Sequence, residues 1–112
     1  MLNETFGWGN PKLSVATSKR SLRIELDPSL LEDLRTLSKP NRQEIGRRIE
    51  EVRQSFGNPH VHGGVGIREL RDGVYEYRVG LQQRLVFSLH KGYLYFRLLG
   101  NHNDVVRFLR HQ

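Results

Sequence analysis

The chain has 112 residues, with 18 Lys and Arg against 12 Asp and Glu, and a net charge of +6. This length suits one domain and is too short for two separate cores. There is no Cys, which excludes disulfides and thiolate metal sites, and no segment approaches the roughly 20 apolar residues of a membrane span. Most cations are Arg, whose planar guanidinium suits phosphate. A polyanion is therefore the first partner to consider, although a basic surface without a partner carries the same charge.

The first 20 residues differ in composition from the rest of the chain. Residues 1–20 are rich in Gly, Ser, Thr and Asn, show no hydrophobic period and lack the apolar core of a signal peptide. We therefore expect an N-terminal extension at residues 1–20, one domain over residues 21–112, no membrane association and a cytoplasmic location.

The next segment is predicted to form a strand and two helices. Residues 22–26 alternate between apolar and polar, which is typical of a half-buried strand. Asp27 and Pro28 are residue types preferred at the cap and the first position of a helix. Asn41 and Glu44 have the spacing of a capping box and are predicted to open a second helix. Each helix carries one apolar stripe, so the pair must pack against another element.

The remaining residues are predicted to form four strands and a final helix. Residues 66–71, 75–79, 84–89 and 93–99 read as strands separated by Gly-containing turns, and a helix is expected after Gly100. The predicted order is β-α-α-β-β-β-β-α. We expect an α+β fold in which an antiparallel sheet packs against an N-terminal αα-hairpin.

Side-chain alternation predicts a cationic face on this sheet. Tyr77 points toward the helices, so its neighbour Arg78 points away from them. The same reasoning turns Leu85 inward and Arg84 outward. Arg78 and Arg84 then share one face of a hairpin, either opposite or diagonal to each other, depending on the register. In the last strand the residues expected to face the core are Leu94, Phe96 and Leu98, and those expected on the cationic face are Tyr95 and Arg97.

One imidazole at the end of this face suggests acid-base catalysis. RNA is cut when a base removes the proton of a 2′-hydroxyl, cations stabilise the charge that gathers on the phosphate, and an acid protonates the leaving oxygen. His102 follows the last strand and is the best candidate for the acid or base, because an imidazole can serve in either role near neutral pH. Arg84 is the best candidate to bind the phosphate. The alternatives are a structural or solvent-exposed role for His102, and a solvated charge or a salt bridge for Arg84.

Other residues have weaker signals. Tyr95 is a candidate to stack on a base, or else covers a sheet edge. His60 and His62 are two residues apart, but no third ligand follows at a recognisable interval, so neither a metal nor another cofactor is expected. In one interpretation the loop brings His62 into contact with a substrate, and in the other the loop has no functional role.

Three motifs resemble the RelE/ParE superfamily of toxins from bacterial type II toxin-antitoxin systems. They are residues 70–79 (LRDGVYEYRV), residues 84–87 (RLVF) and residues 100–105 (GNHNDV), and the last resembles the YafQ-like branch. The resemblance implies a RelE-like fold and a toxin that cleaves mRNA on the ribosome without metal and is neutralised by a cognate antitoxin. It implies that Arg84 acts on the phosphate and His102 in acid-base chemistry. The supporting residues are Arg78 in catalysis and Arg68, Arg71, Tyr95, Arg97 and His62 in RNA binding.

Two other functions are compatible with the same fold. A ParE-like toxin would inhibit DNA gyrase and hydrolyse nothing, whereas the motif around His102 favours the nuclease. An inactive relative retained as a partner-binding module is the third alternative.

Overall fold

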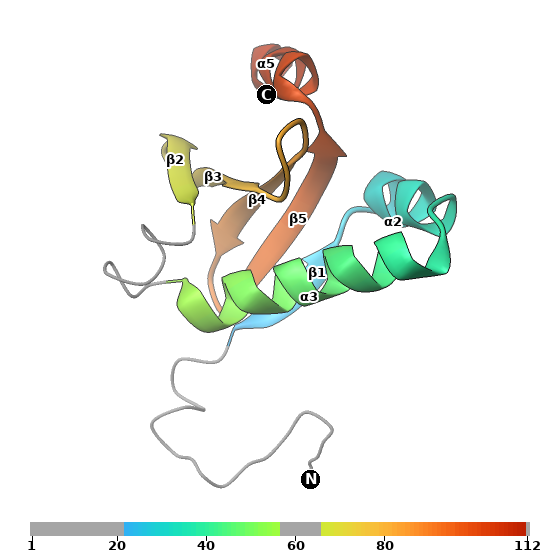
Figure 1. The fold of residues 1–112 in the computed structure, drawn as a ribbon. Coiled ribbons are helices and arrows are strands. Elements are labelled where there is room, and N and C mark those ends of the chain that lie inside the picture. The colour runs from blue at the N-terminus through green and yellow to red at the C-terminus, as the bar shows by residue number, and fades with distance from the viewer. Residues whose placement is uncertain (1–21, 57–65, 112) are drawn as a thin grey trace, which may run out of the picture.

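The computed structural model describes residues 22–56 and 66–111 (Figure 1). In chain order it contains strand β1 (Arg23–Leu26), helices α2 (Pro28–Arg35) and α3 (Lys39–Ser55), strands β2 (Ile67–Arg71), β3 (Val74–Arg78), β4 (Arg84–His90) and β5 (Tyr93–Gly100), and helix α5 (His102–Arg110). This order confirms the predicted α+β fold. The predicted extension at residues 1–20 and the loop that holds His60 and His62 lie outside the described residues.

The five strands form one sheet in the order β1-β5-β4-β3-β2. Strands β2 to β5 pair antiparallel, as predicted. Strand β1 differs, because it pairs parallel with β5. A parallel pair requires a crossover connection, and the chain between β1 and β5 supplies one through α2 and α3.

Helices α2 and α3 lie on one side of the sheet, and their apolar stripes meet its apolar face (Figure 1). Tyr75 and Tyr77 of β3 and Leu85 and Phe87 of β4 face this core, as predicted, whereas Leu89, at the end of β4, is 41% exposed and lies outside it. No helix in the described part of the chain is long and apolar enough to cross a membrane. The main core residues are Leu30, Leu34, Ile45, Ile49 and Val52 of the helices and Ile67, Tyr77, Leu85, Phe87, Leu94 and Phe96 of the strands.

Side-chain caps fix where the two helices begin. The Asp27 carboxylate accepts a hydrogen bond from the Ser29 backbone N–H at 2.9 Å, which confirms the predicted cap of α2. The predicted start of the second helix is wrong. Ser38 is its cap and accepts from the Asn41 N–H, so α3 begins at Lys39. Pro40 is compatible with this position because the first turn of a helix does not use its N–H groups.

A bulge in β5 changes the predicted face of its last residues. Phe87 of β4 pairs with Phe96, but its neighbour Val86 pairs with Leu98, so Arg97 is an extra residue. Beyond the bulge, Leu99 joins the core and Leu98 lies on the opposite face. The prediction that Leu98 faces the core is therefore wrong.

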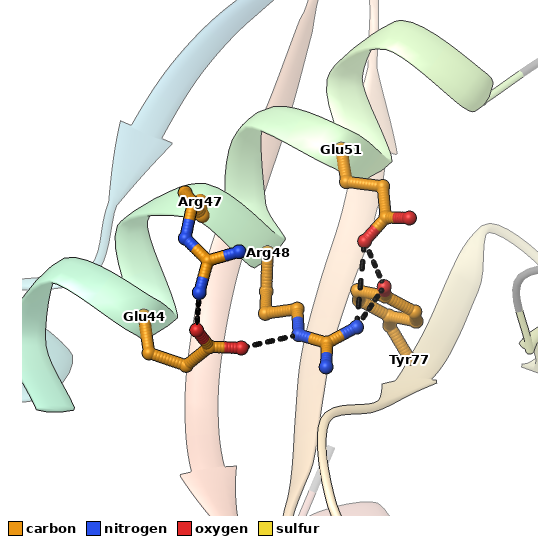
Figure 2. A network of polar contacts seen from close by, with 5 residues as sticks. All are labelled: Glu44, Arg47, Arg48, Glu51 and Tyr77. Carbon is orange, nitrogen blue, oxygen red and sulfur yellow. Dashed lines mark hydrogen bonds and ion pairs between the residues drawn. The ribbon is translucent and has the colours of Figure 1, made fainter.

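Polar contacts also tie α3 to the sheet (Figure 2). Tyr77 of β3 is only 1% exposed, and its hydroxyl reaches the outer side of the core, where it donates to Glu51 and accepts from Arg48 at 3.2 Å. Burial raises the pKa of the Tyr77 phenol, and the hydrogen bond to Glu51 raises it further. Arg48 also binds Glu44 at 2.8 Å, and Glu44 binds Arg47. The network thus satisfies the one polar atom of a buried aromatic side chain.

Helix α5 begins with a capping box directly after β5. The Asn101 side chain accepts from the Asp104 N–H at 2.9 Å, and the Asp104 carboxylate accepts from the Asn101 N–H at 2.8 Å. The helix contacts β4 and β5. Its buried Val105 and the buried Val86 of β4 lie outside the main core, from which we infer that α5 covers part of the opposite face of the sheet.

Replacing Gly100 by Ala is expected to lower the free energy of unfolding by about 1–2 kcal/mol, the usual value of a helix cap. A Cβ at Gly100 would lie 2.6 Å from a carboxylate oxygen of Asp104 and would displace the capping box. Urea unfolding measures the change. Gly46→Ala is the matched control, because a Cβ at this exposed position of α3 meets nothing within 4 Å. It should stabilise the protein by roughly 0.5–1 kcal/mol, and equal effects of the two changes would contradict the capping argument.

Candidate functional site

The strand pairing gathers three predicted site residues at one end of the sheet. Arg78, the last residue of β3, pairs directly with Arg84, the first residue of β4. On its other side Arg84 pairs with Gly100, the last residue of β5, and His102 is the second residue after Gly100. The register that the sequence left open is therefore the opposed one. We call these positions, Arg78, Arg84 and Gly100 to His102, the Arg-His row.

Arg84 is mostly buried and lies beside a buried carboxylate. Its side chain is 14% exposed, and its Nε is 3.6 Å from an Oε of Glu76, whose side chain is 5% exposed. Arg68 of β2 approaches the other oxygen of Glu76 at 3.1 Å. The Arg84 Nε has no hydrogen-bond partner among the described residues, because 3.6 Å is too long for one. Glu76 thus neutralises part of the charge that two Arg side chains bring to this face.

Arg78 and His102 differ from Arg84 in being exposed. In residues 22–56 and 66–111, neither side chain has a hydrogen bond or ion pair. Like charges placed directly opposite each other on adjacent strands repel. The paired Arg78 and Arg84 therefore leave positive charge that an anion would compensate, and His102 follows two residues after the β5 partner of Arg84.

Arg97 and Tyr95 occupy a second cluster, where β5 meets α5 and the start of α2. The Arg97 guanidinium lies 5.1 Å from the centre of the Tyr95 ring and 5.2 Å from that of Phe108 in α5. Its Nε is 4.0 Å from Asp27, and the Tyr95 hydroxyl donates to the same Asp27 oxygen at 3.0 Å. That hydrogen bond raises the pKa of Tyr95. These contacts give Arg97 and Tyr95 a structural role in addition to the predicted RNA contact.

The remaining predicted RNA-binding residues are dispersed. Arg71 donates to the backbone carbonyl of Leu109 at 2.8 Å and so ties β2 to the end of α5. Arg68 is 68% exposed and pairs with Glu76. His62 lies outside the described residues. Within the described ranges, no group of three or more His, Asp and Glu lies close enough together to hold a metal ion.

Glu76 is the residue of this site that the sequence prediction did not include. Its signal was present, because alternation in β3 puts Glu76 on the same face as Arg78. What was missing was the pairing of β3 with β2 and β4, which brings Arg68 and Arg84 to its two oxygens.

The loss of stability at acidic pH should depend on the contacts that Asp27 makes with Ser29, Tyr95 and Arg97. Two hydrogen bonds from Ser29 lower the pKa of Asp27 below its ordinary value of 3.8, and Tyr95 and Arg97 lower it further. A carboxyl whose pKa is lowered by folding adds stability at pH values above its ordinary pKa, and this stability is lost as the pH falls through the folded pKa. Asp27→Asn keeps a capping side chain but cannot titrate.

We expect the Asp27→Asn variant to be less stable than wild type near neutral pH, because it lacks the ionised carboxylate, and to lose less stability as the pH falls below 3.8, so that the two proteins approach each other in acid. Urea midpoints measured across this acidic range give the slope of stability against pH for wild type and for the variant. Part of the slope should remain, because the pKa of Asp104 is also lowered, first by the Asn101 backbone hydrogen bond and then by Arg107. Identical acid profiles for wild type and variant would contradict the assignment.

Comparison with known proteins identifies the fold. No protein-family model and no curated protein matches the sequence. Among solved structures, the chain is similar to the YoeB-YefM complex from Staphylococcus aureus, with 22% identity over 72% of this chain and 97% of that chain, and a TM-score of 0.54. The archaeal RelE-RelB complex from Pyrococcus horikoshii gives 14% identity, coverages of 72% and 94%, and a TM-score of 0.55. The E. coli DinJ-YafQ toxin-antitoxin complex gives 15% identity, coverages of 76% and 97%, and a TM-score of 0.50.

These similarities cover nearly the whole of each matched chain. The protein has the RelE-like fold, which confirms the fold that the sequence resemblance implied.

Proposed function

We propose that the protein is a toxin of the RelE/ParE superfamily that acts as a ribosome-dependent mRNA endoribonuclease. The observation that carries the proposal is the pairing of Arg78, Arg84 and Gly100 in one row, with His102 two residues beyond. In this reading, Arg84 binds the scissile phosphate, Arg78 stabilises the charge that gathers on it, and His102 acts as the general acid or base. Action on ribosomes implies a cytoplasmic location.

A cognate antitoxin is the second partner in this proposal. The similar structures are complexes of YoeB with YefM, of RelE with RelB and of YafQ with DinJ. The net charge of +6 suits an acidic segment that folds on binding to a basic surface.

The test uses the purified full-length chain and ribosomes programmed with a defined mRNA. The proposal expects cleavage within the A-site codon, no cleavage of the same mRNA without ribosomes, and no need for added metal. The absence of cleavage on ribosomes would overturn the nuclease assignment. Inhibition of DNA gyrase in place of cleavage would favour a ParE-like toxin, and inactivity in both assays would favour a partner-binding module.

A further inference from the structure

At the far end of β4 from Arg84, the β4-β5 turn brings two rings together. His90 and Tyr93 pair across the strands, and their rings stack with centroids 4.9 Å apart and planes 13° apart. The Tyr95 ring approaches His90 edge-on, with centroids 6.0 Å apart. His90 is exposed and Tyr93 is half-buried, so the stack presents ring surface to solvent.

This stack lies on the same face of the sheet as Arg84. Leu85 and Phe87 belong to the main core, so Arg84, Ser88 and His90 point to the opposite side of β4. Arg84 and His90 are six positions apart, which corresponds to about 20 Å along a strand. Helix α5 begins at the Gly100 end of β5 and covers part of this face, with Phe108 on Arg97, whereas the β4-β5 turn lies at the other end of β5 (Figure 1).

Neighbouring side chains hold the rings in place. The Ser88 hydroxyl and the His90 Nε2 are 2.9 Å apart and share a hydrogen bond. The Arg23 guanidinium of β1 lies 5.3 Å from the centre of the Tyr93 ring. Rings already fixed in this way lose little conformational freedom when a flat ligand stacks on them.

The charge around the stack favours an anionic ligand. Arg23 lies over the Tyr93 ring, Lys91 directly follows His90 in the β4-β5 turn, and Arg97 lies over the Tyr95 ring. The nearby carboxylates, Glu25 and Asp27, approach Arg23 and Arg97 only at 4.0 Å, and Lys91 has no partner in the described part of the chain. Proteins that bind single-stranded RNA combine aromatic faces for the bases with cations for the phosphates.

We propose that His90 and Tyr93 form a stacking subsite for one base of a single-stranded RNA whose scissile phosphate lies at Arg84. The subsite deepens the proposed nuclease function and rests on it. It would let the protein hold the RNA at two points of the same strand, one through charge and one through stacking.

The test measures stacking directly. The probe is a 2′-O-methyl single-stranded oligoribonucleotide of about eight nucleotides, within the usual range of single-strand sites, with the fluorescent base 2-aminopurine placed in turn at each position. The 2′-O-methyl group removes the attacking hydroxyl, so binding to the full-length protein is measured without cleavage. If the subsite holds one base, the wild-type protein should quench the fluorescence strongly when 2-aminopurine is at one position of the oligonucleotide, and weakly when it is at the others.

Tyr93→Leu is expected to weaken binding about fivefold or more, the range for losing one base-aromatic stack, and to remove the position-dependent quench. Tyr93→Phe keeps the ring and should bind as wild type does. Thermal unfolding of each variant checks its fold, and His90→Gln replaces Tyr93→Leu if the latter does not fold. Unchanged binding by Tyr93→Leu, or equal weakening by the Phe and Leu variants, would overturn the subsite.

Cleavage on programmed ribosomes separates this inference from the proposed function. Quenching without any ribosomal cleavage would overturn the nuclease assignment and leave the RNA subsite in place. Cleavage by wild type without any quench would overturn the subsite alone. Loss of binding to a protein partner by Tyr93→Leu, with RNA binding unchanged, would assign the ring stack to a protein interface and overturn the proposal.

Discussion

Replacing His102 by Ala is expected to slow mRNA cleavage on the ribosome by about 10²–10⁴-fold, the usual contribution of a general acid or base. The imidazole is exposed, and it has no partner in the described part of the chain that its loss would disturb. His102 is the first residue of α5, where Ala is readily accommodated, so the free energy of unfolding should change by less than about 0.5 kcal/mol. Single-turnover cleavage and urea unfolding measure the two quantities.

His111→Ala is the matched control for this experiment. His111 caps the other end of the same helix, is also exposed, and is not part of the Arg-His row. The His111→Ala variant should cleave mRNA as fast as wild type does. If His102→Ala cleaves as fast as His111→Ala, the proton transfer belongs to another group and the assignment of His102 is wrong.

Replacing Glu76 by Ala is expected to lower the free energy of unfolding by about 3 kcal/mol, the lower end of the range for removing one partner of a buried ion pair. The reason is that Arg84, 14% exposed, would keep its charge without the neighbouring carboxylate. Arg68 contributes less to this loss, because at 68% exposure water can solvate it. The urea midpoint and slope measure the effect.

Two further variants test the cause of this loss. Glu25→Ala removes a carboxylate that is 53% exposed and 4.0 Å from an exposed Arg23, so it should change stability by less than about 0.5 kcal/mol. Combining Glu76→Leu with Arg84→Met removes both charges and should restore most of the stability that Glu76→Ala loses. If Glu76→Ala costs no more than Glu25→Ala, the buried carboxylate does not hold Arg84 in place.

Local signals in the sequence predicted most of the fold. The alternation of β1, the Asp27 cap of α2 and the order of the elements all depend on neighbouring residues, and all are confirmed. The start of α3 was predicted at the wrong residue for a local reason as well. Ser38 and Asn41 are both good caps, and only the observed hydrogen bond from the Asn41 N–H to Ser38 decides between them.

The parts that could not be predicted depend on contacts between strands. Alternation placed Arg78 and Arg84 on one face, but their direct opposition follows from the pairing of β3 with β4. The pairing of Glu76 with Arg84, the hydrogen bond from Arg71 to Leu109 and the packing of Arg97 on Phe108 join residues from different elements. The catalytic and RNA-binding roles assigned to these residues remain predictions.

The extra residue at Arg97 has a consequence for comparing this protein with its structural relatives. Without it, strict alternation would place Leu99, and not Gly100, opposite Arg84, and the start of α5 would shift by one position. A sequence alignment without a gap that matches β5 with an unbulged strand of another protein would align His102 with a residue one position away from its true equivalent. Equivalent positions in such pairs must be counted outward from the partner of Arg84, with a one-residue gap allowed at the bulge.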